Sequence, residues 1–383
     1  MLTPRSTLTR RIAAAIDAVP SRIPVLVGGC GTGRTTLVHQ IRERVGRSIS
    51  QYIDVERSAT TPERFLKSVC ASSPFAAAPD ALGARSSFDA VLAFFTSTRA
   101  PGGEPVTFLI DEFLELRTFE SFPGLRRVLH EFADGIAASG NRFVLTSRYT
   151  ARTLRLLKDR PARFEVIHVP ALTAEDTLDM LDFHGDGSGS DVEHTARTVH
   201  ALAEGRPVYV HGLSDELRQM RERGGPGADD AVSALAALMG TGGRLARDCC
   251  SCYELRLHRA RGYGALKAIL DILAEDEGLT LTEISQRLQR TPGSTKDYLS
   301  WLEDVDLVIS RQKRYSFADP LLRVWVRLHC RPVPPSDDDL AREVHRYAMP
   351  RLPQPVEPAL AMVAAGPAGS EDERKPWGII EID

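Results

Sequence analysis

Hydrophobic positions along the chain gather in short apolar runs separated by longer stretches with a helical period. The apolar runs of strand length are Ile23–Val27, Ile49–Val55, Pro105–Phe113, Asn141–Arg148 and Phe164–Val169. The helix-like stretches between them are Thr35–Val45, Pro62–Cys70, Ser87–Thr98 and Gly124–Ala138. Strands that alternate with helices form parallel sheets with right-handed crossovers. Residues 1–171 are therefore predicted to fold as an α/β domain with a parallel sheet.

The pattern changes after residue 171. Residues 172–261 have a helical period throughout and predict a helical lid domain. Residues 262–330 predict three helices and the hairpin Leu307–Phe317, in which Thr291 and Pro292 start the third helix. This order is typical of a winged helix-turn-helix domain. Residues 331–383 form a mostly irregular tail, with one helix-like piece at Asp337–Tyr347.

The turn after the first strand has the glycine spacing of a phosphate-binding P-loop. Glycines let backbone N–H groups curl around a phosphate, and the N-terminus of the following helix favours negative charge. Thr35 stands at the hydroxyl position of this motif. Residues expected to contact a bound nucleotide, ATP or ADP, are Gly28, Gly29, Cys30, Gly31, Thr32, Gly33, Arg34, Thr35 and Thr36.

The run Pro105–Phe113 is apolar until it ends in two adjacent carboxylates. A buried parallel strand delivers such groups to the carboxyl edge of the sheet, where the P-loop also lies. Asp111 and Thr35 are expected to hold Mg²⁺, and Glu112 is expected to polarise the attacking water. Residues Thr146–Arg148 should reach the same edge.

Arg34 occupies the place of the P-loop lysine. A guanidinium is larger and planar, whereas lysine is a compact charge that fits within the loop. Arginine still neutralises phosphate, so nucleotide binding is expected. Catalysis depends on close positioning, which makes hydrolysis slow or absent. A protein that binds nucleotide only for stability is an alternative.

The composition of the 383 residues, 43% hydrophobic and 26% charged, is that of a water-soluble protein. A net charge of −3 gives no global argument for nucleic acid. No run reaches the roughly 18 apolar residues of a membrane span, so we expect no membrane partner. Six scattered cysteines without a secretory signal indicate reduced thiols, so a cytoplasmic protein is expected. The cysteines Cys249, Cys250 and Cys252 lie on a predicted helix and favour core packing over a zinc site, while Cys30 could be oxidised within the P-loop.

The winged-helix segment offers candidate DNA contacts on its third helix and in its wing. They are Ser294, Thr295, Lys296, Tyr298, Arg311, Lys313 and Arg314. Residues 262–330, however, hold nine Lys and Arg against ten Asp and Glu, and Glu303, Asp304 and Asp306 follow the third helix directly. DNA affinity needs a basic face. Packing against protein is the competing interpretation.

The ordered motifs resemble those of the STAND class of AAA+-related P-loop ATPases, in particular the archaeal-type ATPase group that also occurs in bacteria. The matching elements are Gly28–Thr35, Leu109–Glu112, Leu145–Arg148, Gly205–Pro207 and Tyr315–Trp325. The resemblance covers roughly residues 20 to 330. It implies an ATP-controlled switch in which Arg148 senses the terminal phosphate and Pro207 lies near the adenine. Arg34 and the lack of a clear Gly-Arg box before the P-loop depart from the family pattern.

Two functions follow as hypotheses. The main one is an ATP-binding STAND-type molecular switch that acts through protein partners. The alternative is a DNA-binding ATPase or transcription regulator that uses the winged helix. The ending Lys375–Asp383 carries Trp377, Ile379 and Ile380 after a flexible acidic stretch. Such an ending is expected to dock onto a protein partner or to fold back onto its own domain.

Overall fold

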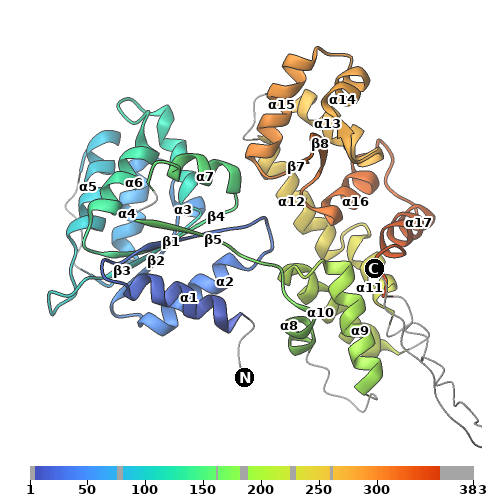
Figure 1. The fold of residues 1–383 in the computed structure, drawn as a ribbon, viewed down its shortest axis with the longest axis horizontal. Coiled ribbons are helices and arrows are strands. Elements are labelled where there is room, and N and C mark those ends of the chain that lie inside the picture. The colour runs from blue at the N-terminus through green and yellow to red at the C-terminus, as the bar shows by residue number, and fades with distance from the viewer. Residues whose placement is uncertain are drawn as a thin grey trace, which may run out of the picture. The chain divides into compact units, whose positions relative to one another are not determined.

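The computed structural model describes residues 5–75, 81–160, 163–181, 189–224, 230–258 and 262–353. Its first part is built on a five-stranded sheet in the order β2-β3-β4-β1-β5, with every neighbouring pair parallel (Figure 1). The strands are β1 (Ile23–Val27), β2 (Ser50–Asp54), β3 (Thr107–Asp111), β4 (Arg142–Ser147) and β5 (Phe164–His168). The predicted α/β fold with a parallel sheet is confirmed.

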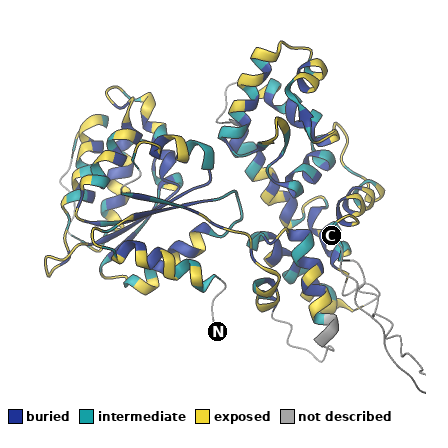
Figure 2. Cartoon of the chain, in the orientation of Figure 1, coloured by how far each residue is buried: buried dark blue, intermediate teal, exposed yellow. Residues whose placement is uncertain are grey.

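Alternate residues of the central strands enter two separate cores, as the two-residue period of a strand requires. Leu26, Leu109 and Val144 pack in the core that includes Ile12 and Ile41 of the helices α1 (Ser6–Asp17) and α2 (Arg34–Val45). Their neighbours in the strands, such as Val25 and Phe108, face the opposite core. That core receives α3 (Val55–Ser58), α4 (Pro62–Ala71), α5 (Ala84–Ser97), the 3₁₀ helix η1 (Phe113–Ser121) and α6 (Val128–Ala138). Figure 2 shows the strands buried between the two helical layers.

A helical part follows β5. It consists of α8 (Ala174–Met180), α9 (Gly189–Ala203), α10 (Pro207–Arg223), α11 (Ala231–Met239) and α12 (Arg244–His258). The later helix α17 (Asp337–Ala348) packs back onto this part, and its Tyr347 hydroxyl donates to the Leu202 carbonyl at 2.7 Å.

The next segment is a winged helix-turn-helix. Its helices are α13 (Tyr263–Glu275), α14 (Leu281–Leu288), α15 (Pro292–Asp304) and α16 (Pro320–His329). The strands β6 (Leu279–Thr280), β7 (Val308–Arg311) and β8 (Arg314–Phe317) form a small sheet in the order β6-β8-β7. Thr280 and Glu283 form a capping box at α14, and Pro292 occupies the first turn of α15. The predicted three helices and hairpin are confirmed, and α16 is a fourth helix that the sequence pattern did not predict.

Several elements depart from the pattern-based expectation, and two of them lie near the site. Helix α7 (Thr150–Leu157) was not predicted, and α6 begins at Val128 rather than near Gly124, because η1 takes up the chain after β3. Both sites lie beside strand ends, where tertiary contacts outweigh a short local pattern. The tail ending at Lys375–Asp383 lies outside the described residues, and the domain boundaries remain predictions. No helix in the described part of the chain is long and apolar enough to cross a membrane.

Candidate functional site

The P-loop leaves β1, the strand between β4 and β5, and leads into α2. Gly31 and Gly33 have φ angles of +74° and +81°, in the left-handed region that favours glycine. A Cβ atom on Gly31 would lie 2.2 Å from Cγ1 of Val208, the second residue of α10. The Val208 N–H donates to the Gly31 carbonyl at 3.3 Å. Glycine at position 31 therefore lets the loop approach α10 closely.

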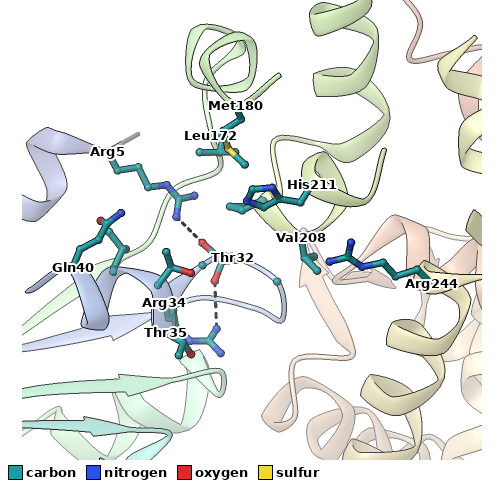
Figure 3. Close-up of a pocket in the computed structure, with 15 residues that line it drawn as sticks. Arg5, Thr32, Arg34, Thr35, Gln40, Leu172, Met180, Val208, His211 and Arg244 are labelled. Atoms are coloured by element: carbon teal, nitrogen blue, oxygen red, sulfur yellow. Dashed lines mark hydrogen bonds between the residues drawn. The ribbon is translucent and has the colours of Figure 1, made fainter. Parts of the chain in front are cut away.

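A cavity of about 530 Å³ opens between the P-loop and the helical part (Figure 3). Its P-loop wall runs from Gly31 to Leu37, and its far wall carries Pro207, Val208 and His211 of α10. Leu172 and Met180 add apolar surface, and Arg5 and Arg244 add charge. Such a mixed, mostly apolar cavity beside a glycine loop has the size and lining of a small-ligand site. Pro207, which the family resemblance places near the adenine, lines this cavity beside Gly33.

Arg34 turns its guanidinium back into the loop. Its Nη1 atom donates to the Gly29 carbonyl at 2.6 Å and also to the Gly28 carbonyl. Its Nη2 atom forms an ion pair with Oε1 of Glu112 at 2.6 Å, and only 9% of the Arg34 side chain is exposed. The planar fork of arginine reaches the loop carbonyls and the carboxylate at once, which a lysine ammonium does less well. Arg34 therefore ties the P-loop to the end of β3.

The end of β3 brings the predicted metal ligands together. The Thr35 hydroxyl donates to Oδ2 of Asp111 at 2.8 Å, and the Tyr52 hydroxyl donates to the same oxygen at 2.9 Å. Oδ1 of Asp111 accepts from the hydroxyl of Thr146 on β4. Burial and the adjacent Asp111 carboxylate raise the pKa of Tyr52, which keeps this phenol a hydrogen-bond donor at neutral pH. Asp111 is thus held as a buried acceptor next to Thr35.

Glu112 lies between two arginines. Besides its pair with Arg34, its Oε2 atom accepts from the Arg148 backbone N–H at 3.0 Å and lies 3.2 Å from Nε of Arg148. Arg148 forms a second ion pair with Glu56. Burial raises the pKa of Glu112, but the charges of Arg34 and Arg148 outweigh burial and hold that pKa below its ordinary value. Glu112 is therefore an ionised carboxylate already neutralised by its neighbours.

These residues fit a nucleotide and Mg²⁺. The glycine loop has the spacing that lets backbone N–H groups surround phosphates, and the cavity beyond Gly33 has room for a base and sugar. Thr35 and Asp111 supply the hydroxyl and carboxylate oxygens that Mg²⁺ prefers. The donors of Arg34 are directed at loop carbonyls and Glu112, so a terminal phosphate would have to replace those contacts.

The sequence patterns missed several cavity residues. Arg5 precedes α1, yet its Nη1 atom donates to the Thr32 carbonyl at 2.6 Å, across the loop from Arg34 (Figure 3). His211 and Arg244 come from α10 and α12. These positions belong to no sequence motif. Only the tertiary fold brings them close to the P-loop. Pro207 at the start of α10 was the one available signal for that wall of the cavity.

The winged helix carries four exposed basic residues, which are Lys296 on α15 and Arg311, Lys313 and Arg314 in the hairpin. Gln312 and Lys313 adopt positive φ angles at the hairpin tip, as a tight two-residue turn requires. Ser294 and Tyr298 are half-buried. Thr295 is fully buried and donates to the Thr291 carbonyl at 3.0 Å, so its side chain does not lie on this surface.

Two of the acidic residues at the end of α15 and just after it contact α7. Asp304 pairs with Arg155 and lies 3.6 Å from Arg152, both on α7. Oδ2 of Asp306 accepts from the Thr150 N–H, the first residue of α7, at 2.9 Å. Asp304 and Asp306 are therefore engaged with the sheet-bearing part of the chain, although Asp306 also lines a cavity with Arg311 of the hairpin.

Comparisons with known proteins agree with this architecture. A family model described as winged helix-turn-helix DNA-binding matches residues 265–309. Among solved structures, a Walker-type ATPase of Pyrococcus abyssi superposes with a TM-score of 0.60 at 17% identity, over 84% of this chain and 95% of that chain. This chain has the fold of a Walker-type ATPase. Its C-terminal part is a winged helix-turn-helix domain.

Two further structures are similar at lower scores. The Orc1 protein of Aeropyrum pernix in complex with DNA has a TM-score of 0.45 at 17% identity, over 84% of this chain and 91% of that chain. Cdc6p of Pyrobaculum aerophilum has a TM-score of 0.40 at 15% identity, over 91% of this chain and 95% of that chain. No curated protein sequence matches this chain.

Proposed function

We propose that this chain is a nucleotide-binding protein that binds duplex DNA through its winged helix, with slow or absent ATP hydrolysis. The observation that carries the DNA part is that acidic residues of the winged helix are paired with α7 while its basic side chains are exposed. Asp304 and Asp306 contact α7, whereas Lys296 and the basic hairpin remain exposed. The balance of nine basic against ten acidic residues therefore does not describe the face that DNA would meet.

ATP or ADP is the proposed ligand of the cavity beside the P-loop. Gly28–Thr36 would surround the phosphates, and Pro207, Val208 and His211 would line the base and sugar. Thr35 and Asp111 would hold Mg²⁺, whose charge would neutralise the phosphate oxygens. Arg148 is proposed to sense the terminal phosphate, since its guanidinium already lies beside Glu112.

Hydrolysis is proposed to be slow because Glu112 is paired. A general base must be free to accept a proton from water, and its low pKa makes Glu112 a weak base while Arg34 and Arg148 neutralise it. The ion pair with Arg34 also holds the P-loop cation away from a phosphate. Binding and turnover are therefore separable properties of this site.

A STAND-type switch that acts through a protein partner is the second candidate. It is favoured by contacts that join the P-loop, α10 and the winged helix. Arg206 pairs with Asp319 at 2.8 Å and donates to the Ala318 carbonyl at 2.7 Å, and the Tyr209 hydroxyl donates to Asp319 at 2.6 Å. Nucleotide could act through such a network. Membership in the archaeal-type ATPase group, a bacterial source and a cytoplasmic location belong to this proposal as well.

The DNA proposal is tested by fluorescence anisotropy with a labelled duplex at a series of salt concentrations. The test variant is Arg311→Ala/Lys313→Ala/Arg314→Ala. The charge-matched control is Arg44→Ala/Arg47→Ala/Lys67→Ala, which removes exposed residues of the sheet-bearing part. We expect the hairpin variant to lose at least about tenfold in affinity and to lower the salt slope by up to about three, while the control changes little. Equal losses in both variants would contradict the proposal.

A further inference from the structure

The P-loop and α12 bring two cysteines together. Cys30 follows Gly29 in the loop, and Cys252 lies on α12. The two thiols lie close enough for each to shift the pKa of the other, although they are far apart in the sequence. Cys252 and Arg256 are four residues apart, so they lie on one face of α12. Nη2 of Arg256 lies 2.8 Å from Sγ of Cys30.

Arg256 holds the Cys30 side chain in place. It is among the largest fully buried side chains, and its Nη1 atom donates to the Asp306 carbonyl at 2.7 Å. Its charge faces Cys30 and favours a thiolate there. The hydrogen bond from Cys252, and then the charges of Arg256, Arg148 and Arg34, hold the pKa of Cys30 well below its ordinary value despite burial. The same hydrogen bond and burial raise the pKa of Cys252.

Cys30 is accessible to a small molecule. It lines a cavity of about 460 Å³ with Arg206, Arg256 and Asp306, on a different side of the loop from the nucleotide cavity. Both Cys30 and Cys252 are half-buried, whereas Cys249 is buried and Cys250 is exposed. No group of three or more His, Cys, Asp or Glu among the described residues could hold a metal ion.

We propose that Cys30 and Cys252 form a reversible disulfide when the protein meets hydrogen peroxide, and that this bond links the P-loop covalently to α12. The Cys30 thiolate attacks one peroxide oxygen, the O–O bond breaks, and the other oxygen leaves as water after taking up a proton. The Cys252 sulfur then attacks the resulting sulfenic acid, forms the S–S bond and releases the second oxygen as water. Two thiols lose two electrons, and one peroxide becomes two waters.

The disulfide has a structural consequence distinct from blocking the nucleotide cavity. Sγ of Cys30 faces α12, so the bond would leave the space beside Gly31 and Gly33 open. It would instead prevent α12, and the Asp306 backbone held by Arg256, from moving relative to the loop. Reversible disulfides of this kind in a reducing compartment act as sensors rather than structural staples.

The test is peptide mapping of the purified full-length protein after treatment with hydrogen peroxide. We expect a linked peptide pair containing Cys30 and Cys252, loss of two free thiols, and reversal by dithiothreitol. Cys252→Ser should abolish the linked pair, whereas the matched variant Cys250→Ser, on the exposed face of the same helix, should retain it. Circular dichroism checks the fold of each variant, and Cys252→Ala replaces Cys252→Ser if the latter does not fold.

The readout is sulfur chemistry alone, so it is independent of nucleotide and DNA binding. Linkage of Cys30 to Cys249 or Cys250 in the wild type would overturn the proposal. So would a wild-type protein in which Cys30 becomes a sulfinic acid while Cys252 stays a free thiol.

Discussion

At the scale of single residues, Arg34 decides how this P-loop differs from one with lysine. Its fork reaches the Gly29 carbonyl and Glu112 together, and both contacts are 2.6 Å long. Glu112 also contacts Arg148, so one buried carboxylate is shared by two cations. Breaking a buried ion pair by removing one partner is costly, because the remaining charge stays desolvated.

Glu112→Gln should therefore lower stability as well as turnover. The change leaves Arg34 and Arg148 without their shared carboxylate, and we expect a loss of about 3 kcal/mol in the free energy of unfolding. Any ATP hydrolysis should disappear while nucleotide binding persists. Urea denaturation and a phosphate-release assay measure the two effects. Unchanged turnover would remove Glu112 from the mechanism.

Arg34→Lys should act in the opposite direction on turnover. A lysine cannot hold the loop carbonyls and Glu112 as a fork does, so the carboxylate becomes freer to accept a proton. We expect steady-state ATP hydrolysis to rise by about tenfold, with the double variant Arg34→Lys/Glu112→Gln inactive as the control. Equal rates in wild type and Arg34→Lys would show that Arg34 does not restrain hydrolysis.

The motifs predicted the residues of the loop and of the β3 end, because each of these positions follows from local spacing. Thr35 and Asp111 indeed meet at 2.8 Å. Arg5, Glu56 and Arg256 could not be predicted, since nothing in their neighbours along the chain marks them and tertiary packing alone brings them to the loop. Thr295 is predicted as a DNA contact because it lies on the third helix of the winged helix, but in the structure its side chain points into the core.

At the scale of elements, the strands and long helices could be predicted from the period of their hydrophobic residues, whereas α7 could not. That short helix forms beside Asp304 and Asp306, and these contacts help to fix its first turn. The Asp306 carboxylate accepts a hydrogen bond from the Thr150 N–H at the N-terminus of α7, where a negative charge is favourable. The Asp306 side chain is nevertheless substantially buried. Burial raises the pKa of Asp306 to about 6.

The raised pKa predicts a pH-dependent stability. A carboxyl whose folded-state pKa lies above its unfolded value contributes stability at low pH that is lost as pH rises through the folded value of about 6. Asp306→Asn keeps an acceptor for Thr150 but cannot ionise. We expect it to be more stable than wild type at pH 8, by about 1 to 2 kcal/mol, with the difference shrinking below about pH 6 and vanishing near the unfolded value of about pH 4.

Thermal melts across this pH range measure the effect. The exposed neighbour Asp297→Asn serves as the control and should change the melting temperature little at any pH. A constant difference between Asp306→Asn and wild type at all pH values would contradict the assignment to ionisation of Asp306.

At the scale of the whole molecule, the sheet-bearing part, the helical part and the winged helix share one network around the P-loop. Val208 packs on Gly31, Arg206 joins Asp319, and Arg256 joins Cys30 to the Asp306 carbonyl. The order of the parts was predictable from the sequence. Their contacts were not, because each contact depends on single side chains at sites without a recurring motif.

Binding of a nucleotide to this network is the central claim, and calorimetric titration with ATP or ADP in the presence of Mg²⁺ tests it most directly. A ligand that binds the folded form must also stabilise it, so the same samples should melt at higher temperature. We predict saturable one-site binding in both wild type and Arg34→Lys. The absence of binding in both proteins, with neither melting temperature changed, would contradict the assignment of the P-loop cavity as a nucleotide site.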